Sequence, residues 1–102
     1  MKIWLDDVRI MPDGFDRHVR SAAEAIGLLV RGRVTAISLD YDLGDSRYGT
    51  GYDVACWIRK AACEGRLAPI AISIHSADPE GCALMEEAIA EAKRCWSDTI
   101  NG

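Results

Sequence analysis

Apolar runs alternate with segments of helical periodicity along this chain. Three runs rich in apolar or β-branched residues predict strands at residues 2–8, 34–40 and 68–76, and RHVR at 17–20 is a further candidate strand. The run VTAISLD at 34–40 is the most strand-like, and its apolar character is typical of a parallel strand that is buried on both faces. The run at 17–20 is short, and we expect it at an edge of the sheet.

Three helices are predicted from apolar residues that are spaced three and four apart. The first follows Ser21, whose capping-box partner Glu24 comes three residues later, and it stops at Gly32. The second is expected at residues 52–63, where Thr50 precedes the helix as its N-cap.

The third helix is expected to start at Pro79, because Asp78 is a favoured N-cap and proline is favoured at the first helical position. We expect it to end near Trp96, with residues 97–102 as a tail. Strands that alternate with helices indicate an α/β domain with an open parallel sheet. The segment between the first two strands is too short for a helix, so the expected strand order is 2-1-3-4. Residues 1–102 are expected to form a single domain.

Polar side chains end three of the predicted strands. The first strand ends in Asp6 and Asp7, the third in Asp40 with Asp42 just beyond, and the fourth in His75 and Ser76. In open α/β sheets, ligands bind beyond the carboxyl ends of the strands where the strand order reverses. With the order 2-1-3-4 that reversal lies between the first and third strands, so these side chains should lie together.

The clustered carboxylates predict a metal site. Two carboxylates about 4 Å apart repel by roughly 4 kcal/mol at an effective dielectric constant near 20. A shared proton or a divalent cation can offset that repulsion. We therefore expect Asp6, Asp7, Asp40 and Asp42 to hold Mg²⁺ or Mn²⁺. For Asp42 and for Asp45, capping of the loop is the alternative interpretation.

Other residues near these strand ends are candidates for phosphate chemistry. His75 is expected to carry a proton as a general acid or base, and the Ser76 hydroxyl can donate to a phosphoryl oxygen. The backbone amides at the start of the third helix favour an anion. Arg9 and Arg47 lie in predicted loops, and each either binds phosphate or is a solvated surface charge. The candidates for phosphate binding are Arg9, Arg47, Thr50, Ser76 and Asp78.

Composition narrows the class of partner. The chain has 12 basic and 16 acidic residues, for a net charge of −4, and its basic residues are scattered. Duplex DNA binding is therefore not expected, although a nucleotide or an RNA end remains possible as a ligand. No apolar run is long enough for a membrane span and no signal peptide precedes the first strand, so we expect a cytoplasmic protein.

The four cysteines contain no Cys-x-x-Cys pair. We interpret them as reduced thiols in or near the core, with a zinc site or a disulfide as the alternative. They are Cys56, Cys63, Cys82 and Cys95.

The motifs at the strand ends resemble two related families. An acidic pair after the first strand, Asp40 after the third and Ser76 after the fourth are similar to the receiver domains of response regulators, although the first helix and the fifth strand with its lysine are missing. The motifs WLDDVR, SLDYDLGD, TGYDVACWI and IHSADPEG together resemble the cyclic-phosphate-processing receiver family, which is tied to RNA repair. That family often has a histidine where Tyr41 stands and an asparagine where Asp78 stands. The resemblance implies a reduced receiver or flavodoxin-like fold.

Three hypotheses about function follow. The first is a metal-dependent phosphoesterase or phosphotransferase that acts on cyclic phosphates of nucleotides or of RNA 2′,3′-ends, with Asp40, His75 and Ser76 as catalytic residues. Either an activated water or Asp40 itself attacks phosphorus in that case. The second is a receiver-like module that signals or binds a ligand without catalysis. The third is a non-catalytic domain that assembles with a partner.

Overall fold

The computed structural model describes residues 1–45, 47 and 49–101, and its helices and strands alternate as expected. The strands are β1 (Lys2–Leu5), β2 (Arg17–Val19), β3 (Ala36–Leu39) and β4 (Ala71–Ile74), and the helices are α1 (Ala22–Val30), α2 (Gly51–Cys63) and α3 (Pro79–Asn101). All four strands are parallel and lie in the order β2-β1-β3-β4. The α/β class and the 2-1-3-4 order are confirmed.

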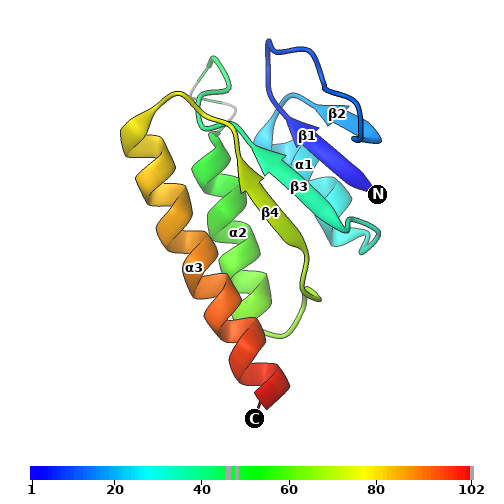
Figure 1. Ribbon diagram of the computed structural model, residues 1–102, viewed down its shortest axis with the longest axis vertical. Helices are drawn as coiled ribbons and strands as arrows, with labels where there is room; N and C mark the ends of the chain where they lie inside the picture. Colours follow the sequence, from blue (N-terminus) through cyan, green and yellow to red (C-terminus); the bar gives the residue numbers. More distant parts are fainter. Residues whose placement is uncertain (46, 48, 102) are drawn as a thin grey trace.

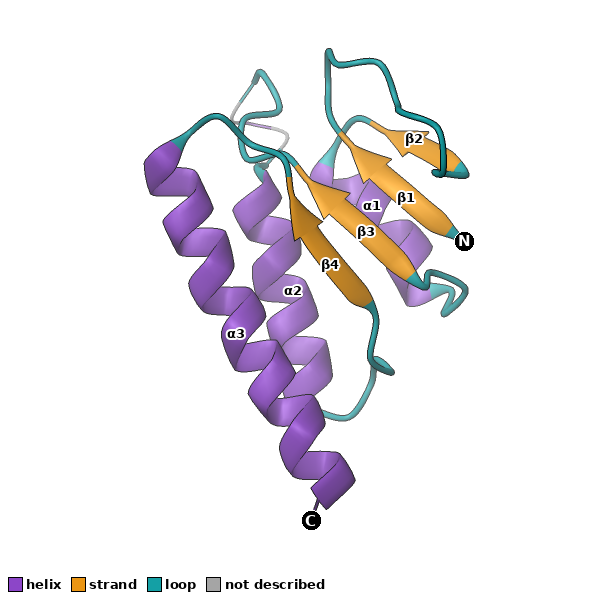
Figure 2. Cartoon of the chain, in the orientation of Figure 1, coloured by secondary structure: helices purple, strands orange, loops and turns teal. Residues whose placement is uncertain are grey.

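The helices cover one face of the sheet. Figure 1 shows α1 and α2 behind the strands, with α3 packed beside α2 rather than over the sheet. The same layers are visible in Figure 2, where all the strand arrows point toward the loops that lead into α2 and α3. Ile3, Leu5, Ile37 and Leu39 are almost fully buried in this layer. Burial of these aliphatic side chains supplies the main favourable term in folding.

The other face of the sheet carries no helix among the described residues. Side chains alternate along a strand, so Trp4 and Ser38 point to the face opposite the aliphatic core. Phe15, from the loop between β1 and β2, packs edge-on against Trp4 with 5.2 Å between ring centroids. This loop replaces a helix as the cover of that part of the sheet.

The last helix is longer than predicted, since α3 continues to Asn101 through residues that we expected to be a tail. No glycine or proline occurs between Gly81 and Gly102, so the sequence has no residue that would break the helix. Trp96 is buried, and its Nε1 donates to the Leu67 carbonyl at 2.8 Å, which holds the last turns against the core. None of the described helices combines the length and the apolar character needed to cross a membrane.

Two of the four cysteines are joined. Cys63 at the end of α2 and Cys95 near the end of α3 form a disulfide, with 4.9 Å between their Cα atoms. Our interpretation of these two residues as reduced thiols was therefore wrong. Their separation of 32 residues gives no local motif, and they meet only because α3 packs along α2. Cys56 and Cys82 are free and half-buried.

Candidate functional site

The sheet itself brings the central residues of the site together. Hydrogen bonding between strands continues one residue beyond three strand ends. The backbone N–H of Asp6 donates to Val19 (3.1 Å), that of Asp40 to Leu5 (3.1 Å) and that of His75 to Leu39 (3.0 Å). The three side chains therefore lie side by side at the carboxyl edge of the sheet, as the strand order predicts.

Asp6 is the buried centre of this cluster. Its side chain is fully buried, and Oδ1 accepts the backbone N–H groups of Val8 at 2.9 Å and Arg9 at 2.8 Å. Its other oxygen, Oδ2, lies 3.1 Å from Nε2 of His75 and 3.9 Å from Nε of Arg9. Asp6 thus fixes the turn after β1 and holds the histidine ring at the same time.

The His75 ring is held on three sides. Nε2 faces Asp6, and Nδ1 lies 2.7 Å from Oγ of Ser38. The ring stacks on Trp4 with 3.6 Å between centroids and 9° between the planes. Both nitrogens of His75 therefore have hydrogen-bond partners inside the protein. In contrast, Nε1 of Trp4 is the one buried side-chain nitrogen or oxygen without a hydrogen-bond partner in the described part of the chain.

The pKa of Asp6 is set by opposing effects. Burial alone would raise it, but the N–H groups of Arg9 and Val8, together with His75, hold the pKa below the ordinary aspartate value. Because the ionised form is favoured, Asp6 carries its negative charge at neutral pH.

The pKa values of Asp40 and His75 are each shifted in the direction that favours the uncharged form of the side chain. Burial and the neighbouring charge of Asp6 raise the pKa of Asp40 above the ordinary value. Burial lowers the pKa of His75 in spite of its hydrogen bond to Asp6. At neutral pH the imidazole is therefore uncharged, and it does not neutralise the two carboxylates beside it.

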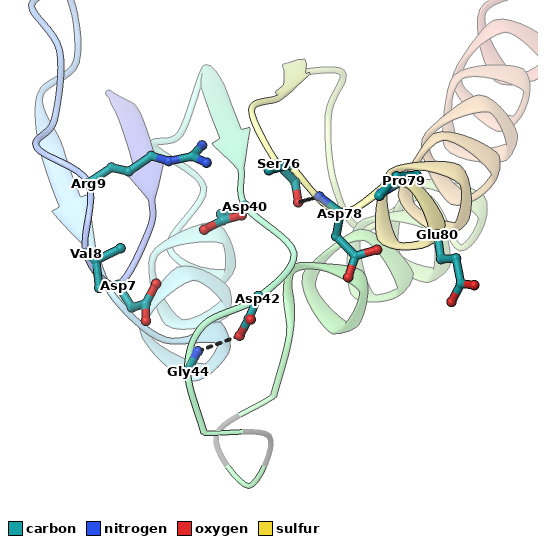
Figure 3. A pocket seen from close by; sticks show the side chains of 11 residues that line it. Asp7, Val8, Arg9, Asp40, Asp42, Gly44, Ser76, Asp78, Pro79 and Glu80 are labelled. Carbon is teal, nitrogen blue, oxygen red and sulfur yellow. Dashed lines mark hydrogen bonds between the residues drawn. The ribbon is translucent and has the colours of Figure 1, made fainter.

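A pocket of about 760 Å³ opens beside the cluster. Asp40 lines it, together with the predicted residues Asp7, Arg9, Asp42, Ser76 and Asp78. Figure 3 shows the Arg9 side chain reaching across the pocket above Asp40, with Ser76 and Asp78 on the opposite side. Asp6 and His75 are not among the residues that line the pocket, and Asp40 is the member of the cluster that does.

The polar groups of this pocket are partly committed to the fold. Oδ1 of Asp42 accepts the N–H of Gly44 at 2.9 Å, and Oδ1 of Asp78 caps α3 by accepting the N–H of Gly81 at 2.9 Å. Oγ of Ser76 accepts the N–H of Asp78 at 3.2 Å, so its own O–H can still donate to a ligand. The structure supports both the loop-capping interpretation of Asp42 and its place in the pocket.

Two glycines allow the elements around Asp40 to approach closely. A Cβ on Gly51 would overlap the carbonyl oxygen of Asp40, and a Cβ on Gly81 would overlap the ring of Tyr41. The Tyr41 ring therefore packs against the first turn of α3. It lines a smaller neighbouring hollow of about 190 Å³ rather than the main pocket.

Two predicted phosphate-binding residues lie outside the main pocket. The Arg47 guanidinium forms a two-pronged ion pair with Asp45, with Oδ2 of Asp45 2.9 Å from Nε and 2.6 Å from Nη2. Thr50 lines the smaller hollow, and its N–H donates to Oδ2 of Asp53 at 2.7 Å. Their roles in binding remain predictions.

The sequence interpretation missed Ser38 and Trp4. Each stands two residues before a predicted site aspartate on the same strand, Ser38 before Asp40 and Trp4 before Asp6. Because side chains alternate, residues two apart share a face of the sheet. That spacing was the available signal, and it points to the residues that hold His75.

The cluster has the donor set of a divalent-cation site. Asp6, Asp40 and His75 each offer one ligand atom, and these atoms lie within 4.8 Å of one another. Asp7 and Asp42, which we also predicted as ligands, line the pocket but are not part of this group. Carboxylate oxygens suit Mg²⁺ and Mn²⁺, whereas imidazole suits Zn²⁺ and other transition metals. The set combines donors of both kinds, two carboxylates and one imidazole.

Comparison with protein families places this site within a described family. A protein-family model described as the cyclic-phosphate-processing receiver domain matches residues 1–91, which include every residue of the cluster and of the pocket. None of the curated proteins and none of the solved structures matches the chain.

Proposed function

The chain belongs to the cyclic-phosphate-processing receiver family, and from that premise we propose that it is a metal-dependent phosphoesterase or phosphotransferase. Its proposed substrates are cyclic phosphates, either of free nucleotides or of RNA ends with a 2′,3′-cyclic phosphate. The observation that carries this proposal is the group formed by Asp6, Asp40 and His75, which meets the pocket at Asp40.

The charge of the pocket supports a requirement for a cation. Among the described residues its lining has one guanidinium, from Arg9, against five carboxylates. The carboxylates belong to Asp7, Asp40, Asp42, Asp78 and Glu80. A phosphate group that entered this pocket alone would be repelled. A divalent cation held at Asp40 would supply the positive charge that offsets this repulsion and polarises the phosphoryl group.

The residues of the chain have distinct proposed roles. Asp40 is shared by the cluster and the pocket, so it is the carboxylate that can either position a water or attack phosphorus itself. Ser76 donates its hydroxyl to a phosphoryl oxygen, and Arg9 binds the phosphate from the opposite side. Because His75 does not line the pocket, while its Nε2 faces Asp6, we assign it a metal-ligand role rather than proton transfer to the leaving group.

The test is a screen of purified protein with Mg²⁺, Mn²⁺ or Zn²⁺ against 2′,3′-cyclic nucleotides and RNA with cyclic-phosphate ends. We expect metal-dependent ring opening that is lost in Asp40→Ala and retained in Arg31→Ala, an exposed arginine at the far end of α1. A search for phosphorylated Asp40 under single-turnover conditions separates covalent catalysis from an activated water. The absence of turnover with every metal, together with the absence of any metal-induced thermal shift, would contradict the proposal.

The second candidate is a receiver-like module without catalysis. The position of Asp40 at the end of β3, in contact with the pocket, is the observation that keeps it open. Stable labelling of the wild type by a small phosphodonor and Mg²⁺, lost in Asp40→Asn and not followed by turnover, would favour this candidate. A cytoplasmic location and a role in RNA repair are further proposals that depend on the first candidate.

A further inference from the structure

Ser38 carries a buried hydroxyl in the middle of the sheet. It contacts His75, one of the three residues of the candidate cation site. It lies in β3 with 3% of its surface exposed, and its Oγ is 2.7 Å from Nδ1 of His75. Ser73 is its neighbour in β4, at the matched position of the strand pair, and is exposed. The two serines lie on the same face of the sheet, and they differ in burial and in contact with the imidazole.

In the metal-free protein the hydrogen bonds of His75 define one tautomer. An ionised carboxylate only accepts hydrogen bonds, so Asp6 requires the proton of the neutral ring to lie on Nε2. Nδ1 is then an acceptor, and the Ser38 hydroxyl donates to it.

A cation at the cluster requires the opposite arrangement. Nε2 is the nitrogen that faces Asp6, so it is the atom of His75 that lies in position to bind a cation. Binding needs the lone pair of Nε2, so the proton leaves Nε2 for solvent while Nδ1 takes one up, and the ring stays neutral. Nδ1 then donates to Ser38.

A hydroxyl can serve both arrangements, because it donates one hydrogen bond and accepts others. A carboxylate in this position would accept only, and an ammonium would donate only. A ligating histidine is generally oriented by a hydrogen bond at its other nitrogen, and loss of that partner typically weakens metal binding about 10- to 100-fold.

We propose that Ser38 is a positioning residue that orients His75 and lets the ring exchange its tautomer when a divalent cation binds. The inference rests on the proposed function only in that a cation binds at Asp6, Asp40 and His75. Ser38 does not line the pocket, and it acts through the histidine.

The first experiment reads the tautomer directly. Protein labelled with ¹⁵N-histidine is studied by long-range ¹H–¹⁵N NMR, first with EDTA and then with Zn²⁺, which is diamagnetic and suits imidazole and carboxylate ligands. We expect the proton of His75 on Nε2 without metal and on Nδ1 with Zn²⁺. A proton on Nδ1 in the metal-free protein, or no change at His75 on addition of Zn²⁺, would overturn the proposal.

The second experiment measures the affinity for Zn²⁺ from the metal-induced thermal shift. Ser38→Ala should weaken binding about tenfold or more. Ser38→Thr, which keeps the hydroxyl, should restore most of the affinity, and Ser73→Ala should leave it unchanged. The shift must be lost in Asp40→Ala, because Zn²⁺ can also bind the free thiols of Cys56 and Cys82.

Equal Zn²⁺ affinity of Ser38→Ala and wild type would refute the role of Ser38, whatever the effect on stability without metal. If Ser38→Ala does not fold, the tautomers of the wild type still decide. Neither experiment uses a phosphate substrate, so a protein that behaves as expected here but opens no cyclic phosphate would refute the proposed function and leave this inference intact.

Discussion

Gly51 lies directly against the main chain of Asp40. Its N–H donates to the carbonyl of Tyr41 at 2.9 Å, and a methyl group on its Cα would overlap the carbonyl oxygen of Asp40. The first turn of α2 and the end of β3 are therefore in contact through their backbones, with no side chain between them. This contact fixes where the Asp40 carboxylate stands.

Gly51→Ala is expected to destabilise the protein by about 1–3 kcal/mol, because the added methyl group meets backbone that cannot rotate away. Thermal unfolding measures the effect. Gly27→Ala is the matched control, since Gly27 lies inside α1 with open space around it and should gain about 0.5–1 kcal/mol. Equal effects of the two substitutions would contradict the close approach at Gly51.

Asp40→Asn is expected to raise the melting temperature of the metal-free protein at neutral pH. The raised pKa of Asp40 means that its ionised form costs stability in the folded state. That cost appears as pH rises from the ordinary value of 3.8 through the higher folded pKa, and it is absent at lower pH. The gain should therefore be present at pH 7 and should disappear near pH 3.

Melting temperatures in EDTA, measured from pH 3 to pH 8, test this expectation. The exposed loop residue Asp13 supplies the control Asp13→Asn, which should change little. In the presence of Mn²⁺ or Zn²⁺ the order should reverse, since the wild type gains the metal-induced shift and Asp40→Asn does not. A loss of stability in the metal-free variant would show that Asp40 is held by favourable contacts.

Asp6→Asn is expected to lower the stability of the folded protein at neutral pH, which is the opposite of the effect expected for Asp40→Asn. The lowered pKa of Asp6 means that its charge stabilises the fold above the ordinary value of 3.8, and this stabilisation is lost as pH falls through the lower folded pKa. The amide oxygen of asparagine can still accept the backbone N–H groups of Val8 and Arg9. The amide NH₂ group then faces Nε2 of His75, where the carboxylate oxygen had accepted a hydrogen bond. We expect a loss of about 1–3 kcal/mol at pH 7. Denaturant unfolding should show a gap between variant and wild type that narrows below pH 3.8.

The disulfide between Cys63 and Cys95 should stabilise the protein by about 3–4 kcal/mol, since it closes a loop of 32 residues in the unfolded chain. Cys95→Ser should lower the melting temperature and remove its dependence on reductant. Cys82→Ser should leave that dependence in place. Thiol titration of the unfolded, unreduced protein should find two thiols, and a count of four would contradict the bond.

Arg9→Ala is expected to weaken substrate binding roughly tenfold or more, because the proposed charged hydrogen bond from its guanidinium to phosphate would be lost. Arg9 lines the pocket, and its guanidinium donates to the backbone carbonyl of His75, which holds the side chain over Asp40. The readout is KM for a cyclic nucleotide, with Arg31→Ala as the control for a general change in charge. An unchanged KM would indicate that the backbone amides of α3 and the Ser76 hydroxyl, rather than Arg9, bind the phosphate.

The sequence predicted the fold well where local pattern and topology agree. Alternation of strands and helices predicted the sheet order, and Asp78 before Pro79 predicted the start of α3 at the residue where it begins. The meeting of Asp6, Asp40 and His75 followed from the same topology, because parallel strands end at one edge.

The direction in which individual side chains point could not be predicted from the sequence. Asp6 and Asp7 are adjacent, and only the pleat decides that Asp6 faces His75 while Asp7 faces the pocket. Arg9 and Arg47 are both loop arginines in the sequence, and the loop conformation alone places Arg9 over Asp40 and Arg47 against Asp45. The disulfide likewise depends on how α3 packs along α2.

The hydrogen bonds that extend the sheet at Asp40 and His75 have a consequence for folding. The two residues are donors in the same ladders that join β1, β3 and β4, so the cluster is complete only when strands far apart in the sequence have paired. Such non-local parallel pairing is slow to form, and it is lost mainly in cooperative unfolding. A chain truncated before β4 lacks His75 and the strand that positions it, and in the full chain the amide hydrogens of Asp40 and His75 should be among the last to exchange with solvent.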